Sequence, residues 1–254
     1  MPGRDLDLLT LAAREAGRIA LRYWKRDAQV WDKADGAGPV TEADLAVNAM
    51  LVERLRAARP DYGWLSEETP DSDDRLACDW VFIVDPIDGT RAFIAGEDTF
   101  SHSLAVAHQG RIVAAVVYLP VLDRMYAASA DGAATRDGAE ICASPRDSDV
   151  GANLLVTRAN MEPALWPGGV PEVKRSFRPS IAFRLCLAAE GWADGMLTLA
   201  PTWEWDIAAG VLIAERAGCV VTDRRGNGLR FNSRAAQADG VDRKSTRLNS
   251  SHRP

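Results

Sequence analysis

The sequence has few of the features that mark an exported, membrane-bound or zinc-binding protein. It contains only four cysteines in 254 residues, with no Cys-x-x-Cys pair and no histidine at ligand spacing. This scarcity argues against a disulfide framework and against structural zinc. No run of about 18 apolar residues occurs, and the N-terminus lacks the apolar core of a signal peptide. We therefore expect a cytoplasmic protein with no membrane insertion.

Positive charge is also scarce. The chain has 30 Lys and Arg residues against 36 Asp and Glu residues, which gives a formal net charge of −6. Because a nucleic-acid backbone attracts a basic surface, we expect no nucleic-acid polymer as a partner. An acidic protein that handles phosphorylated compounds needs metal ions to reverse its local field. The apolar content of 47% is ordinary for a globular chain of this length.

Hydrophobic periodicity predicts a layered arrangement of helices and strands in two lobes, residues 1–140 and 141–241. We expect helices over residues 5–27, 41–59, 180–190 and 206–217, and strands over 62–65, 81–84, 103–107, 111–119, 124–128, 154–157, 196–199 and 219–222. The strands between 103 and 128 are spaced as an antiparallel meander. Residues 31–39 are expected to be a loop, and the acidic, turn-rich segment 70–75 a mobile one.

The most informative stretch is Trp80–Phe93, which reads WVFIVDPIDGTRAF. A short apolar strand ends in Asp85 and Asp88, and Gly89-Thr90 then opens a helical turn. Carboxylates at the tip of a strand, followed by the free amides of a helix N-terminus, suit cations and phosphate together. An alternative needs no function, because Asp85 could cap a helix and Asp88 could close a turn.

Two other acidic groups stand at element boundaries. Glu67-Glu68 follow the predicted strand 62–65, and Asp206 begins a helix. Carboxylates from three segments could hold two Mg²⁺ ions about 3.5–4 Å apart, the arrangement used for phosphoryl displacement. Asp44 closes a capping box with Thr41, which explains it without a function, and an outer position near metal is the alternative.

The combination of DPIDGTRAF, a preceding SEE and a distant WEWDIAAG resembles the inositol monophosphatase family of Mg²⁺-dependent, lithium-sensitive phosphatases. The resemblance extends from the first helix to about Val241. It implies a mixed α/β fold, the five-layered αβαβα sandwich of the inositol monophosphatase and fructose-1,6-bisphosphatase type, here truncated at its C-terminus. It also implies two or three Mg²⁺ ions, inhibition by Li⁺, a small phosphorylated substrate and a homodimer as one option.

The resemblance further implies roles for individual residues. Glu67 would ligate one ion and, with Thr90, orient the attacking water. Asp85 would bridge two ions and take part in catalysis, and Ile87 would contribute its backbone carbonyl. Asp88 and Asp206 would complete the second metal site. The set expected to contact the phosphate or substrate is Asp88, Gly89, Thr90, Asp206 and Arg184.

The implied reaction is direct attack of metal-activated water on a phosphate monoester. A phosphatase that uses an Asp nucleophile in D-x-D spacing is excluded, because Pro86 and Ile87 separate the two aspartates. A Ser-His-Asp mechanism is not supported either, since His102 and His108 lie in the predicted meander.

The leaving group is less defined. The segments DGTRAFIAGEDTFSHSLAV and SIAFRLCLAAEGWAD resemble the 3′(2′),5′-bisphosphate nucleotidase branch, in which Arg184 or Arg178 would meet a second phosphate. Both arginines could instead be exposed charges. Inositol 1-phosphate, histidinol phosphate and other sugar phosphates remain alternatives, as does an inactive metal-binding regulatory protein.

The C-terminal segment stands apart. Residues 242–252 read DRKSTRLNSSH, which resembles the in-frame translation of a common sequencing-library adapter. We therefore interpret residues 242–254 as an artefact, exclude them from the fold and expect the chain after residue 241 to lie unpacked beside an exposed sheet edge.

Overall fold

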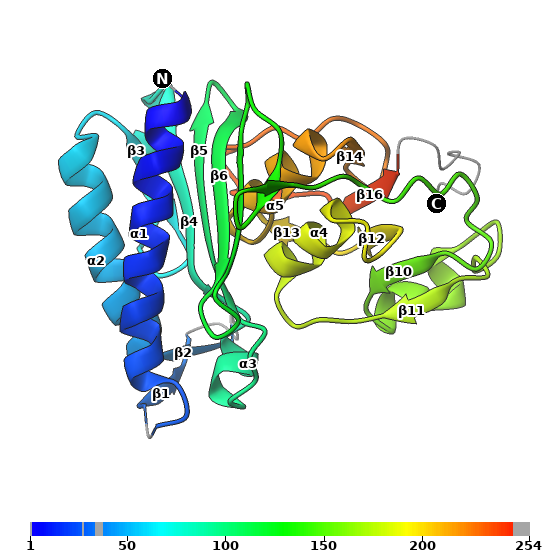
Figure 1. Ribbon diagram of the computed structural model, residues 1–254, viewed down its shortest axis with the longest axis horizontal. Helices are drawn as coiled ribbons and strands as arrows, with labels where there is room; N and C mark the ends of the chain where they lie inside the picture. Colours follow the sequence, from blue (N-terminus) through cyan, green and yellow to red (C-terminus); the bar gives the residue numbers. More distant parts are fainter. Residues whose placement is uncertain (1, 27, 34–37, 246–254) are drawn as a thin grey trace.

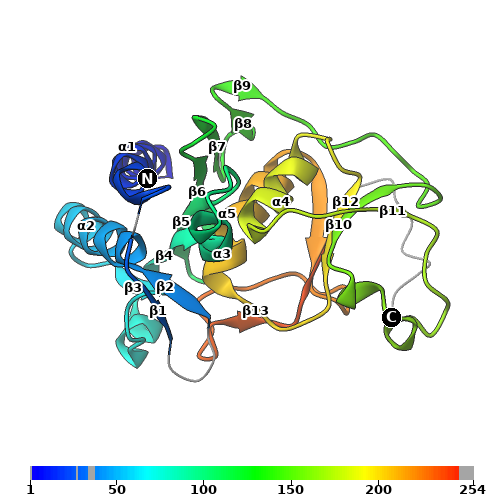
Figure 2. The same ribbon diagram turned by 90° about the horizontal axis from the view of Figure 1, so that it is seen from below.

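The structure is a computed structural model that describes residues 2–26, 28–33 and 38–245. Its elements form layers (Figures 1 and 2): helices α1 and α2 cover one face of a seven-stranded sheet, and helices α4 and α5 separate that sheet from a second one of five strands. The expected layered α/β fold is therefore confirmed. None of the described helices is both long enough and apolar enough to cross a membrane.

The helices are α1 (Pro2–Tyr23), α2 (Glu42–Ala58), α3 (Thr90–Ile94), α4 (Ile181–Ala189) and α5 (Glu204–Arg216), with short 3₁₀ turns η2 (Asp73–Ala77), η3 (Ala159–Met161) and η4 (Pro163–Leu165). The strands are β1 (Val30–Asp32), β2 (Pro39–Thr41), β3 (Gly63–Ser66), β4 (Trp80–Asp88), β5 (Ser101–His108), β6 (Arg111–Leu119), β7 (Arg124–Ser129), β8 (Thr135–Arg136), β9 (Ala139–Glu140), β10 (Asn153–Val156), β11 (Lys174–Ser176), β12 (Gly195–Thr198), β13 (Thr202–Trp203), β14 (Cys219–Thr222), β15 (Gln237–Ala238) and β16 (Val241–Ser245).

Helix α1 lies close against the first sheet because its inner face is built from small residues. Leu9, Ala12, Ala13, Ala16 and Ala20 recur at helical spacing on this face, and their side chains are fully buried. A Cβ atom at Gly17 would approach a ring carbon of Tyr118 to 2.6 Å, so the glycine permits this close contact with β6. The helix ends at Tyr23, earlier than expected, because Lys25 adopts a left-handed conformation with φ of 56°.

The first sheet has the order β3-β4-β5-β6-β7-β8-β9. Strand β3 runs parallel to β4, and each later neighbour is antiparallel, which confirms the predicted meander. Asp137 and Gly138 both have positive φ and form the two-residue turn between β8 and β9. The arrangement places β4 inside the sheet, between β3 and β5.

Helices α4 and α5 form the buried middle layer. Almost every residue of α4 is buried, and α5 contacts strands of the first sheet and β14 of the second. A Cβ atom at Gly210 would lie 2.6 Å from the side chain of Leu185, so the two helices touch at this glycine. The position of Asp206 at the start of α5 is consequently fixed by the core.

The second sheet has the order β11-β10-β12-β16-β14. Its outer face is covered by the segment of η3 and η4, where Trp166 and Met161 contact Val156 and Leu197. Among the described residues, the outermost layer on this side thus consists of short 3₁₀ turns.

The expectation that the chain after residue 241 lies unpacked is wrong for residues 242–245. These residues continue from buried Val241 into β16, which pairs antiparallel with both β12 and β14. Two facing strands offer a complete set of backbone partners, and these hydrogen bonds do not depend on which side chains the inserted strand carries. Residues 246–254 lie outside the described part.

Two expected loops are also corrected. At the two ends of the expected loop 31–39, Val30–Asp32 and Pro39–Thr41 pair as short antiparallel strands, while residues 34–37 lie outside the described part. The acidic segment 70–75, expected to be mobile, leads into η2 and carries Arg75, whose side chain is 2% exposed. Arg75 pairs with Asp71, whose side chain is 41% exposed, and an acidic and turn-rich composition does not reveal this contact.

Candidate active site

The end of β4 forms the floor of the site. The strand continues to Asp88, and its pairing with β5 shifts register between Asp85 and Asp88, both of which are buried. The amide of Ile87 donates to Asp85 Oδ1 at 3.0 Å. The hydroxyl oxygen of Thr90 lies 3.1 Å from the carbonyl oxygen of Ile87 and 3.3 Å from Asp44 Oδ1. The bulge thus gathers two carboxylates, a carbonyl and a hydroxyl.

Gly89 makes the turn from β4 into α3. Its φ of 95° lies in the left-handed region, which favours glycine, and it is the N-cap residue of the short helix that begins at Thr90. A Cβ atom here would meet the backbone of Ser180 at about 3.5 Å. The turn therefore lies directly against the segment that leads into α4.

Asp88 connects the end of β4 to the start of α4. Its Oδ2 accepts from the Ser180 hydroxyl at 2.6 Å and from the amide of Ala182 at 2.7 Å, and its Oδ1 accepts from the amide of Ile181 at 3.2 Å. A carboxylate suits these free amides at the start of α4. Burial raises the pKa of Asp88 to about 6, and the three hydrogen bonds oppose that rise.

Glu67 and Glu68 share one cation. The ammonium of Lys33 lies 2.6 Å from Glu67 Oε1 and 2.6 Å from Glu68 Oε1. Burial raises the pKa of Glu68 to about 7. Burial also acts to lower the pKa of Lys33, but the charges and hydrogen bonds of the two glutamates outweigh it and leave that pKa above its ordinary value. Lys33 is thus a positive charge at the edge of an acidic cluster.

Asp206 and Asp44 complete the cluster. Burial, followed by the charges of Glu67, Asp88 and Asp206, raises the pKa of Asp85 far above its ordinary range. The pKa of Asp206 is also raised well above its ordinary value, by burial and by the charges of Asp88 and Glu67. Asp44 accepts from the backbone and side chain of Thr41 in the predicted capping box, and burial raises its pKa to about 6. Five carboxylates from four segments therefore act on one another.

The donor set fits a hard divalent cation in its chemistry, since carboxylate and carbonyl oxygens are the ligands that Mg²⁺ prefers. In the part of the chain that the structure describes, however, no three His, Cys, Asp or Glu side chains converge closely enough to hold an ion. The oxygens of Asp88 are bonded to amides and a hydroxyl, and Glu67 contacts Lys33. These side chains would have to exchange present partners for an ion.

A cleft of about 540 Å³ opens beside this cluster. Its lining includes Glu67, Gly89, Thr90 and Arg184. The Arg184 side chain is 5% exposed, and its Nη2 donates to the carbonyl of Pro179 at 3.0 Å, while its buried Nε makes no hydrogen bond. Burial lowers the pKa of this guanidinium. Arg184 therefore places a largely buried cation in the lining of the cleft.

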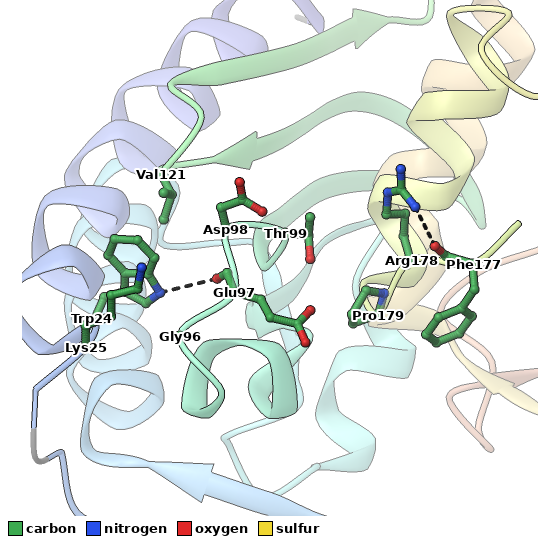
Figure 3. A pocket seen from close by; sticks show the side chains of 10 residues that line it. All are labelled: Trp24, Lys25, Gly96, Glu97, Asp98, Thr99, Val121, Phe177, Arg178 and Pro179. Atoms are coloured by element: carbon green, nitrogen blue, oxygen red, sulfur yellow. Dashed lines mark hydrogen bonds between the residues drawn. The ribbon is translucent and has the colours of Figure 1, made fainter.

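Arg178, the alternative to Arg184, lies elsewhere. It lines an adjoining cavity of about 720 Å³ that shares Glu97, Phe177 and Pro179 with the cleft (Figure 3). Its Nη1 donates to the carbonyl of Phe177, and its guanidinium lies over the ring of Trp192. The two arginines, six residues apart in the chain, thus face different cavities.

The structure therefore brings together all the predicted site residues: Asp44, Glu67, Asp85, Ile87, Asp88, Gly89, Thr90, Arg184 and Asp206. Sequence reasoning missed Lys33 and Ser180. Ser180 could have been found, because a serine directly before an apolar-periodic segment is a helix N-cap signal, and its hydroxyl does cap α4. No local pattern marks Lys33, since only folding brings it to Glu67.

A layered α/β fold with clustered carboxylates beside a helix N-terminus is typical of enzymes that act on phosphate esters through metal ions. The comparisons define the class further. The model of the inositol monophosphatase family matches residues 5–252, and the chain belongs to this family. Its members are generally Mg²⁺-dependent phosphatases.

Two curated relatives and one solved structure are informative. The chain is 32% identical over 234 residues to the 3′(2′),5′-bisphosphate nucleotidase CysQ of Escherichia coli K12, covering 90% of this chain and 94% of the relative. It is 32% identical over 247 residues to an inositol-1-monophosphatase of Mesorhizobium japonicum, and this match covers 87% of this chain and 86% of the relative. The structure of a Thermotoga maritima IMPase matches with a TM-score of 0.81 and 26% identity. This match covers 97% of this chain and 93% of the other.

Proposed function

We propose that the protein is a Mg²⁺-dependent phosphomonoester hydrolase that uses an activated water molecule as nucleophile. The observation that carries this proposal is the cluster formed by Glu67, Asp85, Asp88 and Asp206 beside the cleft at the start of α3. Mg²⁺ bound there would acidify a water molecule and neutralise charge on the phosphate and on the leaving oxygen.

Each residue of the candidate site then has a role. Glu67 and Thr90 orient the attacking water, since Thr90 is fixed by the Ile87 carbonyl and Asp44. Asp85, the Ile87 carbonyl, Asp88 and Asp206 would hold two or three Mg²⁺ ions, and the amides of Gly89 and Thr90 would receive phosphate oxygens. Asp44 supports Thr90 from behind. Glu68 lies outside this set and shares Lys33 with Glu67.

For the substrate, a 3′(2′),5′-bisphosphate nucleotide is the best candidate. Arg184 supports it, because a guanidinium in the lining of the cleft is suited to pair with a second phosphate. The relative named as a bisphosphate nucleotidase supports it too. Inositol 1-phosphate is the alternative that the second curated relative suggests. Histidinol phosphate serves as a third candidate substrate and represents the other sugar phosphates.

Phosphate release from a panel of substrates tests the function. Purified protein with Mg²⁺ is expected to release phosphate from 3′-phosphoadenosine 5′-phosphate with a higher kcat/KM than from inositol 1-phosphate or histidinol phosphate. EDTA and Li⁺ should each suppress the reaction. Absence of phosphate release from every monoester, by folded protein, would refute the enzyme and favour the inactive regulatory alternative.

Arg184→Met tests the substrate assignment. Methionine keeps much of the apolar contact and removes the charge, so KM for 3′-phosphoadenosine 5′-phosphate should rise about 10- to 100-fold, as for a lost hydrogen bond to a charged group. KM for inositol 1-phosphate should change little. Arg178→Met is the matched control, since Arg178 faces the other cavity. Equal effects of Arg184→Met on both substrates would contradict a contact with the second phosphate.

A further inference from the structure

A buried polar network joins two of the segments that carry the acidic cluster. Its centre is Arg75, in the segment between Glu67-Glu68 and β4. The Arg75 fork binds both oxygens of Asp71, with Nε to Oδ1 at 2.6 Å and Nη2 to Oδ2 at 2.7 Å. This pair fixes the chain that follows the two glutamates.

The remaining nitrogen of Arg75 reaches the far end of the chain. Nη1 donates to Asn232 Oδ1 at 2.7 Å and to the carbonyl of Ser233 at 2.9 Å, and Asn232 returns a bond from Nδ2 to the carbonyl of Arg75 at 3.0 Å. Asn232 has a φ of 60°, in the left-handed region that asparagine tolerates better than most residues. The backbone at Arg75 lies tight against β3, because a Cβ atom at Gly63 would be 3.1 Å from the Cβ atom of Arg75.

Glu204 closes the network from the other side. It is the first residue of α5, two positions before Asp206, and its side chain is buried. Its Oε2 accepts from the amide of Asn232 at 2.6 Å, and its Oε1 accepts from the amide of Ser233 at 2.9 Å. The turn at residues 232–233 is thereby held between Arg75 and the start of the helix that presents Asp206.

We propose that Glu204, Arg75 and Asn232 are positioning residues that set the location of Asp206 relative to Glu67, and so determine the affinity of the site for divalent cations. This rests on the proposed function, in which both carboxylates serve the metal site. A buried ion pair by itself contributes little net stability compared with apolar packing. Groups that hydrogen-bond a metal ligand typically change metal affinity 10- to 100-fold because they fix its position, and here the network fixes the backbone that carries the ligands instead.

A purely structural role makes a different prediction. It predicts that a variant loses stability to heat but binds metal normally well below its melting temperature. Glu190 provides a comparison, because its carboxylate also accepts two hydrogen bonds, here from the side chains of Tyr126 at 3.0 Å and Arg136 at 2.7 Å, at the opposite end of α4 from the acidic cluster. Glu190→Gln therefore weakens similar contacts away from the proposed ligands.

The experiment is calorimetric titration of the full chain with Mg²⁺ at a temperature well below Tm, together with phosphate release. Glu204→Gln removes one acceptor from the two amides and should weaken Mg²⁺ binding about tenfold or more. Glu190→Gln should leave the Mg²⁺ Kd within about twofold. Arg75→Lys, which keeps the charge but loses the fork, should also weaken binding, and it replaces Glu204→Gln if that variant does not fold.

The outcomes separate the two proposals. If the unmodified protein hydrolyses no monoester and binds no Mg²⁺, the proposed function and this inference both fall. If it is active but Glu204→Gln and Arg75→Lys bind Mg²⁺ as it does, only the positioning role is overturned. Equal weakening by Glu204→Gln and Glu190→Gln would also overturn it, since the effect would then not depend on closeness to Asp206.

Discussion

Asp85→Asn is expected to lower kcat by at least about 10³-fold, because the variant loses a negative charge that would hold the divalent cation at the proposed site. The fold should be retained, since an asparagine Oδ1 can still accept from the amide of Ile87. Without Mg²⁺, Tm should stay the same or rise, because one of several mutually repelling carboxylates is removed. Activity assays and thermal melting, each with and without Mg²⁺, measure both effects.

Asp79→Asn is the control for this variant, since Asp79 is an exposed aspartate just before the same strand. It should change neither activity nor the rise of Tm that Mg²⁺ causes. Activity of Asp85→Asn within tenfold of the unmodified protein would remove Asp85 from the metal site. Asp88→Asn is a less informative variant, because Asp88 also caps α4 with both of its oxygens.

Glu67→Gln is expected to lower kcat by about 10²- to 10⁴-fold, the range for loss of a group that positions or deprotonates the nucleophile. Glu68→Gln should lower it less than about tenfold. Both glutamates lie 2.6 Å from the ammonium of Lys33, so each variant loses the same kind of ion pair. Comparing kcat of Glu67→Gln and Glu68→Gln therefore separates the loss of water activation from the loss of the ion pair with Lys33.

Steady-state kinetics of the two variants at saturating Mg²⁺ provides the measurement. If Glu68→Gln proves as damaging as Glu67→Gln, the catalytic assignment within the pair is wrong. Equal melting temperatures for the two variants would show that any difference in kcat comes from the site and not from stability.

Much of the fold could be predicted from the sequence because local rules and the final structure agree. The alternation of residues 103–128 predicts the meander, and the Asp137-Gly138 turn has the backbone that those residue types favour. The capping box at Thr41 forms as its residue spacing predicts. Each of these features depends on residues that are neighbours in the chain.

The predictions that failed depend on partners distant in the sequence. Residues 70–74 are exposed, as their composition predicts, but Arg75 is buried where it meets Asn232. Residues 242–245 look unstructured until two strands face them across the second sheet. Lys33 lies in a stretch with no periodicity, and its role as counter-charge to Glu67 and Glu68 exists only in the folded chain. Motif spacing found the carboxylates but could not find the groups that neutralise them.

The acidic cluster also has a consequence for the energetics of folding. Its members come from α2, the end of β3, the end of β4 and the start of α5, so they are brought together only when nearly the whole chain is folded. An unfolded chain has no comparable site for a divalent cation. Any cation that binds the cluster therefore stabilises the native state by mass action, and the free ion concentration becomes a determinant of how much protein is folded.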